Sequence, residues 1–231
     1  DRAPDALVSP CDAVIGAHGR IDQGMLLQAK GMVYRLDELL GDATRAAAHA
    51  NGSYVTLRLK SSMYHRFHAP CAGRLRSIDY ISGDVFNVNP PTLKRLEKLF
   101  CRNERAILPI EIQSMEGESI GTEPDGRAGL GPVTLVPVAA VLVASMRFAF
   151  LSGPLNLRYR GPNRIECDAR FDRGEELGWF EHGSTIVMLA GPGLELAPGL
   201  ATDDTIRMGR PLLVRGRPEL ASKSSRRLRT G

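Results

Sequence analysis

The sequence predicts a β-rich α+β fold with many short antiparallel strands and a few short helices. Short apolar or alternating segments are separated by Gly, Pro, Asn and Asp at intervals of about 8–12 residues, which is typical of chains built from short strands. Helical periodicity is confined to segments of one or two turns. The chain has 231 residues, of which 43% are apolar, so it can bury a substantial core. We expect one domain over residues 1–231.

The first half of the chain combines short helices with strands. The segment YRLDELLG (34–41) predicts one or two helical turns that end at Gly41, and DATRAAAHA (42–50) predicts a second short helix. The alternating apolar residues of SYVTLRLK (53–60) predict a half-buried strand. Residues 68–89 predict a strand–turn–strand unit with turns at Gly73 and SGD, and residues 105–114 predict a strand. Between them, residues 91–100 predict a short helix or a loop with a helical turn.

The second half of the chain is predicted to be mainly β-structure. Residues 116–131 are rich in Gly and acidic residues and predict a mobile loop. The apolar run 133–150 predicts buried strands, with Pro137 at an edge or a bulge because proline cannot donate to a sheet. STIVMLA (184–190) predicts a buried strand. DDTIRMGRPLLVRG (203–216) predicts two short strands around its central glycine.

Composition and charge narrow the classes of partner. The net charge of +4 suits an anionic partner such as a lipid surface or a nucleic acid. Aromatic residues make up only 6%, and no block alternates them with Lys or Arg, which disfavours nucleic-acid binding. The basic segment 222–231 is consistent with either a solvated tail or a contact with anionic lipid.

Cysteine spacing argues against a metal site, and hydropathy argues against a membrane-spanning segment. The four cysteines form no CxxC pair, so we expect no metal site, and their scatter suits a reducing compartment; they lie at 11, 71, 101 and 167. The longest apolar run, 133–144, is shorter than the roughly 20 residues that span a bilayer. No signal peptide is visible, so any membrane contact is expected to be peripheral.

Three segments offer side chains for activating a hydroxyl. Ser184 follows Gly183 in FEHGSTIVML, Asp12 lies in VSPCDAVIG, and His65 and His68 lie in MYHRFHAPCAG. A carboxylate that orients an imidazole, which in turn takes a proton from serine, is a recurring catalytic arrangement. Each of these residues also has a structural interpretation, because Gly-Ser-Thr is common turn chemistry and isolated histidines often lie in cores.

Four blocks in the same order resemble the phosphatidylserine decarboxylases, and together they span roughly residues 8–190. They are VSPCDAVIG with LLQAKGMVYRLDELLG, YHRFHAP, GDVFNVNP with LFCRNERAI, and GWFEHGSTIVML. Three departures accompany the resemblance. His182 stands where the family usually has an apolar or small residue, Ala13 stands where it usually has Gly, and the helical region that precedes the Asp12 block in many members is missing here.

The resemblance implies a pyruvoyl-dependent decarboxylation of phosphatidylserine to phosphatidylethanolamine and CO2. Self-cleavage between Gly183 and Ser184 would yield chains of residues 1–183 and 184–231, and Ser184 would become the covalent pyruvoyl group, whose ketone acts as an electron sink. His68, oriented by Asp12, would be the base for cleavage, and His65 would protonate the carbanion left by CO2.

The resemblance also implies a set of partners and leaves alternatives. We expect a phospholipid substrate, a peripheral contact with the cytoplasmic face of the cell membrane, no nucleic acid, no metal, and a possible homodimer. One alternative is a Ser-His-Asp hydrolase, although the sequence has no G-x-S-x-G motif. Others are a carrier-like β-module, although no lysine sits in a tight hairpin, an unprocessed or inactive homologue, and a decarboxylase of another serine-headed lipid or of a soluble amino acid.

Overall fold

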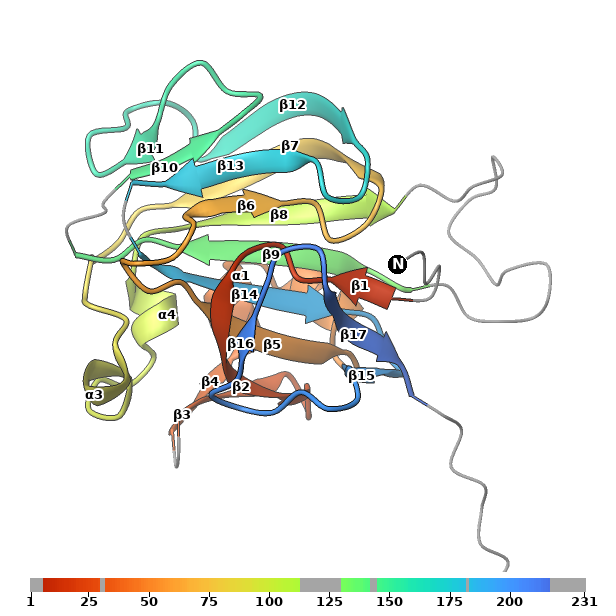
Figure 1. Cartoon of the computed structure of the whole chain (residues 1–231). Coiled ribbons are helices and arrows are strands. Elements are labelled where there is room, and N and C mark those ends of the chain that lie inside the picture. The colour runs from red at the N-terminus through yellow and green to blue at the C-terminus, as the bar shows by residue number, and fades with distance from the viewer. Residues whose placement is uncertain (1–5, 30–31, 113–129, 142–144, 182, 217–231) are drawn as a thin grey trace, which may run out of the picture.

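The structure, a computed structural model, describes residues 6–29, 32–112, 130–141, 145–181 and 183–216, and it confirms the β-rich α+β class (Figure 1). Within these residues the strands are β1 (Ala6–Val8), β2 (Ala13–Arg20), β3 (Met25–Ala29), β4 (Met32–Arg35), β5 (Ser53–Arg58), β6 (Arg66–His68), β7 (Gly73–Ile81), β8 (Arg105–Ile112), β9 (Val133–Val138), β10 (Ser145–Phe148), β11 (Leu155–Asn156), β12 (Arg164–Phe171), β13 (Glu176–Phe180), β14 (Thr185–Ala190), β15 (Leu194–Leu196), β16 (Thr205–Ile206) and β17 (Pro211–Arg215). The helices are α1 (Leu36–Leu40), α2 (Ala43–Ala48), α3 (Pro90–Leu93) and α4 (Leu99–Arg102). Most of the loop predicted over 116–131, His182 and the basic tail lie outside the described residues.

The central feature is an eight-stranded antiparallel sheet in the order β12-β7-β8-β9-β14-β5-β2-β16. Its middle strand, β14, is paired with β9 on one side and β5 on the other, and every residue of β9 and β14 is buried. The prediction of a half-buried strand over 53–60 is wrong in its burial, because the first five residues of β5 are all buried. Both faces of the sheet are covered here, so polar as well as apolar positions lie inside.

Pro137 does not lie at an edge, as the sequence suggested. It lies opposite Ile186 in β9, and β9 is itself paired with β8 and β14 in the middle of the sheet. Proline removes one ladder donor, but the flanking pairs persist in unbroken register on the β14 side. The apolar ring occupies a buried position, which favours the strand despite the missing hydrogen bond.

A second sheet, in the order β11-β10-β13-β6, lies in front of β7 and β8 in Figure 1. Three phenylalanines hold it together, because the ring of Phe67 lies 5.8 Å from that of Phe148 and 5.4 Å from that of Phe180. All three are essentially fully buried. This packing fixes β6, the strand that ends at His68, and β13, the strand that leads toward Gly183.

The predicted helices form with the expected signals. Gly41 ends α1 with a φ of 66°, a left-handed conformation that glycine adopts without strain. The Asp42 side chain caps α2 by accepting the backbone N–H groups of Thr44 and Arg45. The helix predicted over 91–100 is divided into α3 and α4, because Lys98 adopts a φ of 54° between them. The strand predicted after the SGD turn (82–84) does not form, and Asp84 contributes only an isolated bridge to Asn103.

The two ends of the described chain lie side by side. β17 pairs with β1 and β15 in a three-stranded sheet, and β16 pairs with β2 at the edge of the large sheet. The turn between β1 and β2 contains Asp12, so C-terminal residues surround this turn. A separate hairpin, β3–β4, projects beside α3 (Figure 1).

Candidate active site

Ser184 immediately precedes β14 and is completely buried. Its carbonyl accepts the N–H of Leu59 at 2.7 Å, so the pairing between β14 and β5 continues to this residue. Its hydroxyl donates to the carbonyl of Val138, the last residue of β9. Ser184 is therefore held by the main chains of both neighbouring strands, in the middle of the large sheet.

Gly183 packs against the backbone that follows β5, and no side chain fits there. A Cβ atom at this position would lie 2.4 Å from the carbonyl oxygen of Leu59, 2.8 Å from the nitrogen of Ser61 and 2.9 Å from the carbonyl carbon of Lys60. These distances are shorter than real Cβ contacts, and the opposing atoms belong to the main chain. The requirement for glycine before Ser184 is therefore steric. This contact could not be read from the sequence.

The two histidines have different hydrogen bonds. The Nδ1 of His68 lies 3.0 Å from the carbonyl oxygen of Gly174, so Nδ1 carries the proton, and Nε2 accepts from the hydroxyl of Tyr64 at 3.2 Å. Tyr64 also stacks on the imidazole, with ring centroids 5.8 Å apart. The Nε2 of His65 lies 3.0 Å from the carbonyl oxygen of Lys60, so this nitrogen is a donor. The Nε2 of His68 is thus a hydrogen-bond acceptor, whereas the Nε2 of His65 carries a hydrogen and is a donor.

Asp12 contacts the C-terminal part of the chain rather than a histidine. Its carboxylate accepts from the guanidinium of Arg207 and from the backbone N–H of Met208, the latter at 2.9 Å. The expected hydrogen bond between Asp12 and the imidazole of His68 is not among the contacts of the described residues. The two are related through the main chain, because the N–H of His68 donates to the carbonyl of Pro10 at 2.7 Å. Asp12 stabilises the turn that is hydrogen-bonded, through Pro10, to the backbone of His68.

The structure therefore brings the predicted residues to one region without joining them all. His65 lies next to Gly183, because both contact the main chain of Lys60. His68 lies beside the Asp12 turn. In the described contacts the hydroxyl of Ser184 is bonded to Val138 and not to either histidine.

The sequence motifs did not single out one buried acid near this region, Glu104. Glu104 precedes β8 in the block LFCRNERAI and is completely buried, and this burial raises the pKa of its carboxyl to about 7. Its sequence signal is an acidic residue directly before a strongly apolar strand, but exposed acids also occur at such strand ends.

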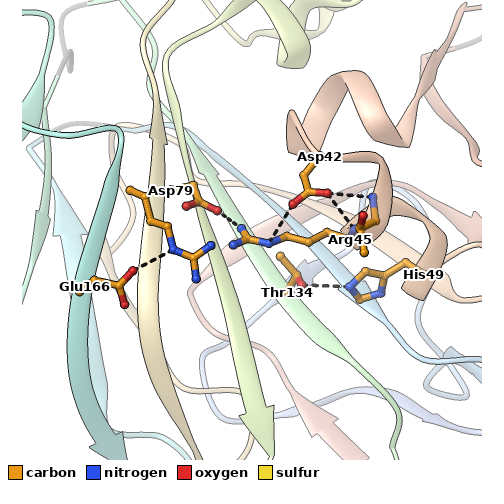
Figure 2. Close-up of polar contacts among 8 residues, drawn as sticks. Asp42, Arg45, His49, Asp79, Thr134 and Glu166 are labelled. Atoms are coloured by element: carbon orange, nitrogen blue, oxygen red, sulfur yellow. Dashed lines mark hydrogen bonds and ion pairs between the residues drawn. The ribbon is translucent and has the colours of Figure 1, made fainter.

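A second polar cluster lies near the opposite end of β9 and β14 (Figure 2). The Nε2 of His49 lies 2.9 Å from the hydroxyl of Thr134, and burial lowers the pKa of this imidazole to about 4, so it is neutral near pH 7. Thr134 lies opposite Leu189, four positions along β14 from Thr185. The nearby Arg45 pairs with Asp42 and Asp79 in Figure 2. This cluster links α2 to the sheets and is remote from Ser184.

The described residues contain neither a metal-binding cluster nor a membrane-spanning helix. Among them, no group of three or more His, Cys, Asp or Glu side chains is arranged to hold a metal ion. In the same part of the chain, no helix has the length and apolarity needed to cross a membrane.

Comparison with known proteins places the chain in a family. The family model described as phosphatidylserine decarboxylase matches residues 1–214. The chain belongs to the phosphatidylserine decarboxylase family. It is 33% identical to a phosphatidylserine decarboxylase proenzyme of Brevibacillus brevis over 213 residues, which covers 90% of this chain and 71% of the relative. It is 37% identical to the proenzyme of Chromobacterium violaceum over 215 residues, which covers 88% of this chain and 69% of the relative. The prediction of a decarboxylase from the sequence blocks is confirmed.

Proposed function

We propose that this member of the phosphatidylserine decarboxylase family cleaves itself between Gly183 and Ser184 and then converts phosphatidylserine to phosphatidylethanolamine and CO2 with a pyruvoyl group made from Ser184. The observation that carries the proposal is the buried Gly183–Ser184 pair. The serine is held on both sides by strand backbones, and the glycine is required by a main-chain contact. The names of the relatives as proenzymes support a processed enzyme.

Self-cleavage begins with attack of the Ser184 hydroxyl on the carbonyl carbon of Gly183. The hydroxyl must first turn away from the carbonyl of Val138, and its proton passes to a base, for which His68 offers an unprotonated Nε2. The C–N bond between the two residues breaks and an ester forms. A base then removes the Cα proton of residue 184 and the Cβ–O bond breaks, so Gly183 leaves as a carboxylate and an unsaturated residue 184 remains. Water displaces its nitrogen as ammonia and supplies the oxygen of the ketone.

The residues around Ser184 fit the group that this sequence of steps would produce. The site is enclosed, because Ser184 is completely buried, and its carbonyl stays fixed by the N–H of Leu59. A pyruvoyl group would supply a ketone that combines with the substrate amine and delocalises the electron pair that CO2 leaves on the substrate Cα. The chain itself has to orient the serine head group, exclude water and return one proton to the substrate Cα.

Three residues take distinct roles in this proposal. His68 is the base for self-cleavage, and Asp12 is a positioning residue that holds the turn under His68 through Arg207 and Met208. His65 carries a proton at Nε2 next to the Gly183 backbone and is the donor to the substrate Cα. Loss of such a general acid costs about 10²–10⁴ in rate.

The proposal includes a peripheral contact with the cytoplasmic face of the cell membrane, and the β3–β4 hairpin is the surface that supports it. Leu27 and Val33 lie opposite each other and are 38% and 51% exposed. The amide of Gln28 donates to the carbonyl of the last residue of α3 at 2.9 Å, and the exposed Lys94 and Arg95 follow α3 directly. An exposed apolar pair on a hairpin that is joined to α3, with basic side chains following that helix, suits an anionic bilayer.

Lipid binding is tested by sedimentation with phosphatidylserine vesicles. We expect the Leu27→Ser/Val33→Ser double variant to bind less than wild type, and added salt to weaken the binding of wild type by screening. Leu157→Ser is the matched control, because Leu157 is also exposed, at 43%, but follows β11 on another sheet. Equal binding by all three proteins would contradict a role for the hairpin.

Self-cleavage is tested by intact mass and denaturing electrophoresis of freshly made protein. Wild type should give fragments of 183 and 48 residues from the 231-residue chain, and borohydride should link phosphatidylserine covalently to the 48-residue fragment. Ser184→Ala should stay intact, whereas Ser77→Ala, which changes another buried serine, should cleave normally. An intact wild-type chain with an acylated Ser184 would instead indicate a hydrolase.

A further inference from the structure

Glu104 is an unusual residue for the interior of a sheet. It is completely buried, and neither of its carboxyl oxygens has a hydrogen-bond partner within the described residues. An ionised carboxylate without a partner is costly to bury, so such a group is retained as the neutral acid. The burial raises the pKa of Glu104 to about 7, so its side chain is mostly protonated in mildly acidic solution and becomes ionised as the pH rises above 7.

The residues on either side of Glu104 have structural roles that Glu104 lacks. The amide nitrogen of Asn103 donates to the carbonyls of Phe86 and Ala139, each at 2.8 Å. The guanidinium of Arg105 donates to four main-chain carbonyls, including that of Leu39 at 2.7 Å. The Glu104 carboxyl has no corresponding hydrogen bond to the main chain in the described residues, and the polar group beside it is the Tyr80 hydroxyl.

Strand pairing places Glu104 on the same face of the large sheet as Ser184. Arg105 lies opposite Val138, which in turn lies opposite Thr185. Glu104 precedes Arg105 and Ser184 precedes Thr185, so the same register places Glu104, Ala139 and Ser184 opposite one another in a row across the three strands. Cross-strand neighbours in such a row point to the same face of the sheet. Two strand spacings separate their backbones by about 10 Å. The residue between them in this row is the buried Ala139.

A chain of main-chain contacts connects the two residues. The carbonyl of Glu104 accepts the N–H of Ala139 at 2.8 Å, and the adjoining carbonyl of Val138 accepts the hydroxyl of Ser184. The position of the acceptor for Ser184 thus depends on where the backbone of Glu104 lies. Any force that moves residue 104 acts on Ser184 through two consecutive hydrogen bonds.

Among the groups that face Glu104, only the hydroxyl of Tyr80 favours a negative charge on the carboxyl, and the effect of burial outweighs it. Tyr80 of β7 is the titratable residue next to the carboxyl, and its hydroxyl donates to the carbonyl of Asn156 of β11 at 2.8 Å. Proximity to Glu104 and burial both raise the pKa of Tyr80, so the phenol stays neutral. Arg160 acts on Tyr80 rather than on Glu104 and is exposed to solvent. On β8 itself, Arg105 points to the opposite face of the sheet.

We propose that Glu104 is a positioning residue for Ser184 and that it performs this role only while its carboxyl is protonated. An ionised carboxylate in this layer would draw in water or a new partner. Its backbone would then shift, and with it the Ala139–Val138 segment that holds the Ser184 hydroxyl. This inference rests on the proposed self-cleavage at Ser184 and adds a pH-dependent control of it.

The test compares self-cleavage rates of wild type and Glu104→Gln across neutral and alkaline pH. Glutamine has the shape of protonated glutamate and cannot ionise. The ratio of the variant's rate to the wild-type rate should be near unity below pH 7 and rise roughly tenfold for each pH unit above it. The ratio cancels the effect of pH on every group that is the same in the two proteins. Glu111→Gln, an exposed residue on the same strand that pairs with Arg76, is the control and should give a flat ratio.

The outcomes separate this inference from the proposed function. A ratio that stays constant with pH, or a folded Glu104→Gln that does not cleave, would overturn the role of Glu104. A wild type that never cleaves would contradict the proposed function itself. Infrared spectra of the uncut Ser184→Ala chain supply a second measurement that needs no cleavage. They should show the band of a protonated carboxyl, and this band should disappear as the pH rises through about 7. The band should be absent from the Ser184→Ala/Glu104→Gln double variant. An ionised Glu104 at acidic pH would overturn the proposal.

Discussion

Replacement of Gly183 by alanine should slow self-cleavage strongly, because the new methyl group has no room. The Cβ atom would lie 2.4 Å from the carbonyl oxygen of Leu59, and this distance must grow by about 1 Å to reach an ordinary contact of 3.4 Å. The opposing atoms are main chain, so no side chain can rotate away. Overpacking of this kind costs about 1–3 kcal/mol. A displacement of about 1 Å in a reacting group costs on the order of 10² in rate.

The assay is the rate at which the 231-residue chain disappears on denaturing gels, together with the free energy of unfolding in denaturant. Gly153→Ala is the matched control, because a Cβ at that position meets nothing within 4 Å. We expect the Gly183→Ala chain to cleave about a hundredfold more slowly than wild type, with the control unchanged. If Gly183→Ala cleaves at the wild-type rate, the main-chain contact does not position Ser184 and the reasoning is refuted.

Three further predictions follow from the contacts of individual side chains. His65→Ala should cleave itself but decarboxylate phosphatidylserine about 10²–10⁴ times more slowly, whereas His68→Ala should remain uncut; the opposite pattern on gels and in CO2 release would exchange their roles. Arg207→Ala should slow cleavage as much as Asp12→Asn does, because Arg207 and Asp12 form a salt bridge. Normal cleavage by Arg207→Ala together with slow cleavage by Asp12→Asn would indicate that Asp12 acts directly on His68. His49 has a pKa lowered to about 4 by burial, so its contribution to stability is present above about pH 6.5 and is lost as pH falls toward 4. Denaturant unfolding of wild type should show about 2 kcal/mol of this loss between pH 7 and pH 5, and an equal loss in His49→Gln would exclude His49 as its source.

Much of the local structure was determined by the sequence itself. Gly41 predicted the end of α1, Asp42 the start of α2, and the apolar run after Ser184 the buried strand β14. These signals depend on neighbouring residues only, through backbone freedom, side-chain capping and hydrophobic periodicity. The sequence blocks around His65 and Ser184 likewise sufficed to predict the decarboxylase family, which the comparisons confirm.

Tertiary structure decided the features that depend on which strands become neighbours. Pro137 lies in the middle of a sheet because β8 and β14 both pair with its strand. Asp12 binds Arg207, which is 195 positions away in the sequence, because β16 pairs with β2. It does so although the backbone of His68 is hydrogen-bonded to the same turn. Glu104 shares a row with Ser184 through pairings of β8, β9 and β14 that no local pattern encodes. Each of these contacts joins segments far apart in the chain, and their alignment is set by burial and register of the whole sheet rather than by the residues next to them.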